Sequence, residues 1–92
     1  MQIPYAKQSV NQDDIDQVIE TLQSDFLTQG PQVEKFENEL SKYVGVKYAV
    51  STNSATSALH ISCMALELKK NDTVWTSPIS FVASSNCALY CG

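Results

Sequence analysis

Residues 53–59 are mostly small and in part polar, in the order Asn-Ser-Ala-Thr-Ser-Ala-Leu, and lie between a short apolar run at 48–50 and a helical pattern. Where a strand turns directly into a helix, the first backbone N–H groups of the helix point outward, and the helix dipole adds partial positive charge. Small side chains let an anion approach, and the hydroxyls of Ser54, Thr56 and Ser57 can add hydrogen bonds. The chemistry indicated is phosphate binding, although a turn of this kind alone is more often an ordinary capped helix.

Three cysteines and one histidine raise the separate question of a metal site. Cys87 and Cys91 can share one side of a helix at positions i and i+4, while Cys63 and His60 lie elsewhere in the chain. The pattern lacks the closely spaced ligand pairs that structural zinc sites use, and an odd number of cysteines cannot form a complete internal disulfide framework. We therefore expect buried thiols, a packed histidine and no metal site.

Two amphipathic helices are predicted before the phosphate-binding stretch. The first begins at residue 11 or 12, carries early aspartates that favour its N-terminal dipole, and frays at residues 24–25. The second begins at Pro31, because proline suits the first helical position, and stops at Gly45. Apolar residues recur at helical spacing in both; they are Ile15, Val18, Ile19 and Leu22, then Val33, Phe36, Leu40, Tyr43 and Val44.

Two short strands and two further helices are predicted in the second half of the chain. The strands cover residues 47–51 and 73–76. One helix follows the turn at 53–54 and reaches about residue 68, and a polar break covers 69–72. The last helix begins near residue 80 or 81 and ends at Tyr90. Two strands separated by a helix indicate a parallel α/β arrangement.

The composition is that of an ordinary acidic globular chain, with 92 residues, a formal net charge of -4 and no arginine. Its scattered lysines lack the basic clustering that a nucleic-acid binder needs for phosphate contacts. No apolar run approaches the roughly 20 residues that cross a bilayer, and the first five residues lack the regions of a signal peptide. The sequence predicts a cytoplasmic protein without nucleic-acid or membrane partners, and a solvated helix face formed by Glu34, Glu37 and Glu39.

Four motifs in a fixed order carry a family resemblance. They read S-D-F-L-T-Q-G-P at 24–31, Y-V-G-V-K-Y-A-V at 43–50, N-S-A-T-S-A-L at 53–59 and T-S-P-I-S-F-V-A-S-S-N at 76–86. This series resembles the start of the DegT/DnrJ/StrS sugar aminotransferases, and the similarity runs from Tyr5 to Gly92. The resemblance implies pyridoxal 5'-phosphate as the cofactor and a UDP-linked 4-keto-6-deoxy sugar as the substrate, in nucleotide-sugar biosynthesis of the pseudaminic acid type. Glutamate is the expected amino donor.

The resemblance also assigns residues to the cofactor. Ala55 and Thr56 match positions where backbone N–H groups and a hydroxyl hold the phosphate of pyridoxal phosphate, and Ser54 is close enough to help. Phe81 matches an aromatic position whose ring stacks on the pyridine ring and keeps it oriented. Considered without the motif around it, Phe81 is more simply a core residue at a helix start.

A second set of residues matches positions that line the sugar-nucleotide site in similar enzymes. Hydroxyl groups and loop backbone in this set can bond sugar or diphosphate oxygens. Asn53 and Asn86 can support the site, although capping or turn roles explain them equally well. The matched residues are Tyr5, Asp25, Phe26, Leu27 and Thr28.

Catalytic residues are not expected in this chain. In the resembled enzymes, the Schiff-base lysine and the carboxylate that pairs with the pyridine nitrogen lie in later segments, and the six lysines here match no such motif. We expect the chain alone to be inactive.

The implied fold class is α/β, the incomplete N-terminal part of a fold-type I aminotransferase large domain, in which helices sandwich a mostly parallel sheet. Residues 1–30 would form the N-terminal helix and substrate segment, residues 31–92 would begin the cofactor-binding domain, and the whole enzyme would be a homodimer.

Three alternatives stay open. The chain can be a non-catalytic fragment that binds phosphate or a nucleotide sugar at the same helix N-terminus, or a truncated remnant without function. Some relatives replace the lysine and use pyridoxamine phosphate to deoxygenate sugars, and the residue that separates the two chemistries is not in this sequence. For a fragment of this fold we also expect low solubility, because apolar faces and strand edges would be exposed.

Overall fold

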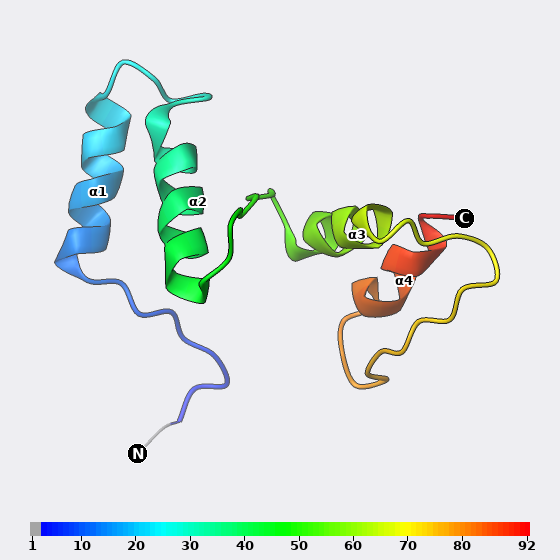
Figure 1. The fold of residues 1–92 in the computed structure, drawn as a ribbon. Coiled ribbons are helices and arrows are strands. Elements are labelled where there is room, and N and C mark those ends of the chain that lie inside the picture. The colour runs from blue at the N-terminus through cyan, green and yellow to red at the C-terminus, as the bar shows by residue number, and fades with distance from the viewer. Residues whose placement is uncertain (1–2) are drawn as a thin grey trace. The chain divides into compact units, whose positions relative to one another are not determined.

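The computed structural model describes residues 3–92, which contain four α-helices and no strand (Figure 1). The helices are α1 (Gln12–Gln23), α2 (Pro31–Val44), α3 (Ala55–Ala65) and α4 (Ala83–Leu89). The prediction that the chain starts without a signal peptide falls partly on Met1 and Gln2, which lie outside the described residues.

Helix α1 begins where its sequence predicts. The Asn11 side chain accepts a hydrogen bond from the Asp14 N–H at 3.0 Å, and the Asp14 carboxylate accepts one from the Asn11 N–H at 2.9 Å. This reciprocal capping box satisfies two N–H groups that the helix itself leaves without partners. At the other end, the N–H and the hydroxyl of Ser24 both donate to the Thr21 carbonyl oxygen, and the helix ends there.

Helix α2 has the predicted proline start and glycine stop. Pro31 lies in the first turn, where its missing N–H costs no hydrogen bond. Gly45 has a left-handed backbone with φ of 70°, and its N–H donates to the Lys42 carbonyl oxygen at 3.2 Å. The next N–H, of Val46, donates to the Ser41 carbonyl oxygen at 2.9 Å. These bonds satisfy the last carbonyl groups of the helix, and the left-handed residue makes them possible.

Helix α3 is shorter than its sequence predicts. It ends at Ala65 rather than near residue 68, because Glu67 turns into the left-handed region with φ of 54°. The Leu68 N–H then donates back to the Cys63 carbonyl oxygen at 3.1 Å, which closes the helix. A non-glycine residue in this conformation leaves no signal in the periodicity, so the extra turn was predicted wrongly.

Helix α4 begins at Ala83 rather than at residue 80 or 81, and it ends at Leu89. Phe81 therefore precedes the helix and lies in irregular structure. The polar break before it is confirmed as a turn, in which the Asp72 carboxylate accepts the Lys69 N–H at 2.9 Å.

The predicted α/β class, with a mostly parallel sheet between helices, is wrong for the described chain. Segments 47–51 and 73–76 form no strand, and neither does any other part of residues 3–92. A β-strand exists only where a neighbouring strand pairs with its N–H and C=O groups. Apolar patterning identifies segments that favour an extended backbone, but it carries no information on whether a partner strand is available.

The chain divides into two units between Ala49 and Val50. The first unit contains α1 and α2, which run in opposite directions (Figure 1). The second unit contains α3 and α4, which pack on each other. The predicted assignment of residues 1–30 and 31–92 concerns segments of a larger enzyme and stays a prediction.

Within residues 3–92, no large side chain is fully buried. The buried residues are small ones, Ala83, Cys87 and Ser41. The apolar stripe of α1 faces outward instead, since Val18 and Leu22 keep 59% and 64% of their surface exposed. Contiguous apolar surface of this kind marks an interface or an aggregation risk. None of the helices in this part of the chain combines the length and the apolar character that crossing a bilayer requires.

Candidate functional site

The stretch at 53–59 forms the N-terminus of α3. Ser54 is the N-cap: its hydroxyl accepts a hydrogen bond from the Ser57 N–H at 3.2 Å, and its carbonyl oxygen accepts one from the Ala58 N–H at 3.1 Å. The N–H groups of Ala55 and Thr56 come first in the helix, where no preceding helical turn supplies an acceptor. These two N–H groups are the ones that α3 offers to an external acceptor.

Side chains around the cap hold this turn in shape. The Ser57 hydroxyl donates to Asn53 Oδ1 at 3.0 Å and lies 3.0 Å from the Ser54 hydroxyl. The Thr52 hydroxyl donates to the Ser54 carbonyl oxygen at 2.8 Å. Asn53 therefore has the turn role that its sequence position allowed, and the hydroxyls of Ser54 and Ser57 are engaged in the cap. Of the three hydroxyls in this stretch, the one of Thr56 takes no part in these cap bonds, so we expect it to be the one that bonds a ligand.

The α3 N-terminus suits a phosphate group in its donors, its charge and its access. Two adjacent backbone N–H groups lie there, at the positive end of the helix dipole, and one of them belongs to Thr56, whose hydroxyl can add a further donor. Ala55 is exposed and Thr56 is half-buried, and the small alanine side chain leaves an anion room to approach. The first turn of α3, which lies entirely within the described residues, has no acidic side chain that would repel an anion. The residues present therefore fit the phosphate of pyridoxal phosphate.

Phe81 lies just before α4, at the wall of a hollow of about 350 Å³. Its side chain is 74% exposed, so the ring is accessible to a ligand. The hollow does not include Ser54, Ala55 or Thr56, so the ring and the phosphate-binding groups do not share a pocket. The other residues of the wall are rich in hydroxyls; they are Thr76, Ser77, Pro78, Ser80, Val82, Ser84 and Ser85.

The predicted substrate segment at 25–28 forms a tight loop between α1 and α2. The Ser24 hydroxyl donates to the Phe26 carbonyl oxygen at 3.3 Å. Gly30 lies so close to the same oxygen that a Cβ atom at this position would come within 2.5 Å of it. Gln29 completes the loop with a left-handed φ of 53°. All predicted substrate residues are exposed; they are Tyr5, Asp25, Phe26, Leu27 and Thr28.

The predicted cofactor and substrate residues fall in different units. Tyr5 and the 25–28 loop belong to the first unit, whereas the α3 N-terminus and Phe81 belong to the second. Each unit therefore carries one half of the predicted site.

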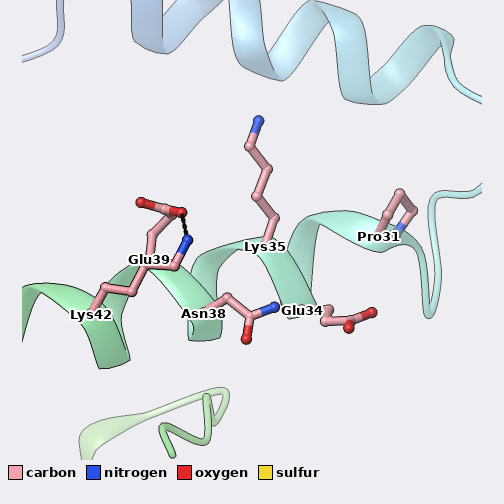
Figure 2. A pocket seen from close by; sticks show the side chains of 6 residues that line it. All are labelled: Pro31, Glu34, Lys35, Asn38, Glu39 and Lys42. Atoms are coloured by element: carbon pink, nitrogen blue, oxygen red, sulfur yellow. Dashed lines mark hydrogen bonds and ion pairs between the residues drawn. The ribbon is translucent and has the colours of Figure 1, made fainter. Parts of the chain in front are cut away.

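One face of α2 carries a shallow hollow of about 290 Å³ lined mostly by charged and amide side chains (Figure 2). Lys42 Nζ pairs with Glu39 Oε1 at 2.8 Å, and this hydrogen bond and the lysine charge lower the pKa of the Glu39 carboxyl group. Lys35 points away from the pair in Figure 2, so the charges do not converge on one point. Glu34 and Glu39 are exposed as predicted, whereas Glu37 is half-buried. The exposed side chains of this surface agree with the solvated helix face that the sequence predicts.

His60 and the cysteines lie in the second unit. The His60 ring packs edge-on against Tyr90, with ring centroids 5.3 Å apart. Cys87 is buried, Cys63 and Cys91 are half-buried, and all three are free thiols. Across residues 3–92, no three His, Cys, Asp or Glu side chains are grouped so that they could hold a metal ion.

Two features of the second unit were missed from the sequence. The Thr52 hydroxyl bond to the cap had a usable signal, since a threonine two residues before an N-cap serine favours a local side-chain turn. The proximity of His60 to Tyr90 had none, because this contact joins α3 to the end of α4. Spacing along the chain predicts neighbours within one helix only.

The sequence pattern of the DegT/DnrJ/EryC1/StrS aminotransferase family matches residues 8–92, and the chain belongs to this family. The predicted family resemblance is thereby confirmed. Enzymes of this family depend in general on pyridoxal phosphate.

Three relatives illustrate the similarity. The chain is 44% identical over 90 residues to the UDP-4-amino-4,6-dideoxy-N-acetyl-beta-L-altrosamine transaminase of Campylobacter jejuni. The aligned residues make up 98% of this chain and 24% of the relative. It is 38% identical over 90 residues to the spore coat polysaccharide biosynthesis protein SpsC of Bacillus subtilis, an alignment that covers 98% of this chain and 23% of SpsC. It is 40% identical over 88 residues to the uncharacterized protein MJ1066 of Methanocaldococcus jannaschii, an alignment that covers 96% of this chain and 23% of MJ1066. The chain thus spans about a quarter of the length of these relatives. No solved structure matches it.

Proposed function

We propose that this chain is the N-terminal segment of a pyridoxal-phosphate-dependent transaminase that aminates a UDP-linked 4-keto-6-deoxy sugar. Family membership over residues 8–92 and 44% identity to the Campylobacter jejuni transaminase support the proposal. Glutamate is the proposed amino donor, in nucleotide-sugar biosynthesis of the pseudaminic acid type. The whole enzyme is a cytoplasmic homodimer in this proposal, and the activity belongs to it rather than to this segment by itself.

The donor arrangement at the N-terminus of α3 is the observation that carries the proposal. Pyridoxal phosphate, when bound, supplies an electron sink that stabilises negative charge on the substrate carbon during amino transfer. For that chemistry the cofactor has to stay anchored while its covalent partners change. The N–H groups of Ala55 and Thr56, with the Thr56 hydroxyl, are the proposed anchor for its phosphate.

Ser54 and Phe81 have different parts in this proposal. Through its cap, the Ser54 hydroxyl holds the first turn of α3, so the two anchoring N–H groups keep their direction. It also lies next to the anchored phosphate and can contact it. The exposed ring of Phe81 packs against the pyridine ring, which limits tilting of the cofactor. In this way the phosphate end and the ring end of the cofactor are held by separate residues.

The loop at 25–28 and Tyr5 are the proposed contacts for the sugar nucleotide. Gly30 lies so close to the Phe26 carbonyl oxygen that a side chain would not fit there, and the Ser24 hydroxyl donates to the same oxygen, so both contacts favour this loop shape before a ligand binds. The hydroxyls of Thr28 and Tyr5 are exposed and can bond sugar or diphosphate oxygens. Exposed Phe26 and Leu27 offer apolar contact to the sugar or base.

Segment exchange tests this proposal. The matching first quarter of the Campylobacter jejuni transaminase is replaced by this chain, and the chimeric enzyme is purified beside the parent enzyme and a parent that lacks the segment. We expect the chimera to bind pyridoxal phosphate and to transfer the amino group of glutamate to the UDP-linked 4-keto sugar, whereas the shortened parent does neither.

The chimera separates the two parts of the proposal. A folded chimera that binds no pyridoxal phosphate contradicts the cofactor assignment of the α3 N-terminus. A folded chimera that binds the cofactor but leaves the UDP-linked 4-keto sugar unchanged contradicts the substrate assignment.

A further inference from the structure

The apolar side of α1 lies open. Its aliphatic side chains keep between 44% and 64% of their surface exposed, although α2 runs alongside in the same unit (Figure 1). Part of this side lines a hollow of about 340 Å³, together with Asp14. Burial of aliphatic surface is favourable, so such a side is typical of a surface that contacts another body. We call the five residues the α1 stripe; they are Val10, Ile15, Val18, Ile19 and Leu22.

The α1 stripe is too small to hold an independent partner by itself. A stable complex buries about 800 Å² on each partner, which would require about 160 Å² from each of five side chains. An aliphatic side chain that is only partly exposed offers less than that. A body joined covalently to this segment needs less area, because the tether raises the effective concentration of the two surfaces. The size of the stripe therefore indicates an occupant on the same polypeptide.

The charge of α1 argues against a second copy of the same helix as the occupant. The helix has four exposed acidic side chains and no lysine. Two antiparallel copies would bring the acidic first turn of one close to Glu20 of the other, and these like charges would repel each other. The charge suits an apolar surface that has lysine or arginine at its rim. The acidic residues are Asp13, Asp14, Asp16 and Glu20.

The relatives contain a body that can cover the stripe. The alignment with the Campylobacter jejuni transaminase includes α1 and makes up 24% of that enzyme, so about three quarters of the enzyme lies outside it. We propose that the α1 stripe docks on this later part of the family enzyme, on an apolar surface bordered by basic side chains. The docking rests on family membership and is independent of the proposed substrate and cofactor.

Docking of α1 would also steady the loop at 25–28. Ser24 ends the helix, and its hydroxyl donates to the Phe26 carbonyl oxygen at 3.3 Å, so the loop begins directly at the docked element. The stripe would thereby help to position the proposed sugar-nucleotide contacts without touching the ligand. This consequence rests on the proposed function, whereas the docking itself does not.

Amide hydrogen exchange tests the docking. Exchange is followed by mass spectrometry on peptides that cover residues 12–23, in the isolated chain and in the chimera with the later part of the Campylobacter jejuni transaminase. We expect the α1 amides to exchange at least about tenfold more slowly in the chimera, because a docked helix opens less often. Equal exchange rates in the two proteins would overturn the proposal.

Two substitutions that add the same charge make the test specific. Val18→Asp places a carboxylate in the stripe. Gln17→Asp places it outside the stripe, since residues at i and i+2 do not share a helix face. In the isolated chain the two variants should have similar helicity by circular dichroism, because Val18 is exposed there. In the chimera, Val18→Asp should lower the midpoint of thermal unfolding by several degrees and restore fast exchange in α1, whereas Gln17→Asp should do neither.

The remaining outcomes are equally decisive. A chimera that stays insoluble, or one whose midpoint falls equally in both variants, would contradict the docking. Dimers of the isolated chain that Val18→Asp dissociates would assign the stripe to a second copy and overturn the proposal. A chimera with a protected α1 that binds no pyridoxal phosphate would contradict the proposed function and leave the docking intact, so the two proposals fail separately.

Discussion

Replacing Ser54 by aspartate separates the two roles of the α3 N-terminus. Aspartate caps a helix as well as serine does, and its charge favours the positive end of the helix dipole. The helix should therefore form as before. The added carboxylate lies beside the N–H groups of Ala55 and Thr56, where it would repel a phosphate. Ser54→Asn is the matched control, since asparagine caps equally well without a charge.

The magnitude follows from the distance between the added charge and the anion. Two unit charges about 6 Å apart repel each other by about 0.7 kcal/mol in water, and a phosphate dianion therefore by about 1.4 kcal/mol. This corresponds to about a tenfold loss of affinity for pyridoxal phosphate relative to the asparagine variant. A drier site increases the effect, because the effective dielectric constant falls.

The assay compares two cofactors in the chimeric enzyme. Pyridoxal phosphate and pyridoxal, which lacks the phosphate, are each titrated into the Ser54→Asp and Ser54→Asn variants and followed by absorbance. We expect the aspartate to weaken binding of pyridoxal phosphate about tenfold and to leave binding of pyridoxal nearly unchanged. The reasoning fails if both cofactors weaken equally, or if neither responds to the charge. Circular dichroism of both variants checks that the helix is intact.

Three further substitutions test single contacts. Phe81→Ala should weaken pyridoxal phosphate binding by the chimera about two- to tenfold while Phe81→Trp retains most of it, and equal affinities would remove the stacking role. Asn11→Ala should destabilise α1 by about 1 kcal/mol and lower the helicity measured by circular dichroism, because the cap is lost, whereas Asn11→Asp should retain both. Unchanged helicity in the alanine variant would argue against the cap. Gly45→Ala should cost about 1 kcal/mol in thermal unfolding of the chimera, because its φ is 70° and no atom lies within 4 Å to interfere. A smaller loss is expected for Gly45→Asn, and the opposite order would contradict the left-handed conformation.

The helix starts of the first unit could be read from the sequence because their causes are local. The bonds between Asn11 and Asp14, and the proline that opens α2, involve residues within one turn of each other. The glycine stop at Gly45 is equally local, since it needs only one residue that tolerates a positive φ. The late end predicted for α3 was wrong for a related reason: Glu67 adopts the same conformation without being glycine.

The predicted sheet failed because strands depend on partners far along the chain. Residues 47–51 and 73–76 have the composition of strands, yet no pairing segment lies beside either of them within residues 3–92. The apolar stripes of α1 and α2 were identified correctly as stripes, but Val18 and Phe36 stay 59% and 57% exposed. Periodicity indicates which face is apolar, whereas the surface that covers it has to be found elsewhere.

In the candidate site, too, the sequence predicts features with local causes and gives no information on contacts between distant segments. Local chemistry predicts an anion-binding site at the α3 N-terminus with Ser54 as part of it; that site stays a prediction, and the structure shows that the Ser54 hydroxyl caps the helix. Motif order supplied Phe81 and the 25–28 loop, which no local rule would have selected. That these groups bind one ligand stays a prediction, because a sequence pattern contains no distances between residues that are far apart along the chain.

The most direct measurement is a crystal structure of the chimeric enzyme with pyridoxal phosphate bound. The account predicts phosphate oxygens at about 2.7–3.2 Å from the N–H groups of Ala55 and Thr56, with the Phe81 ring against the pyridine ring. A phosphate bound elsewhere, with only water at the start of α3, would contradict it.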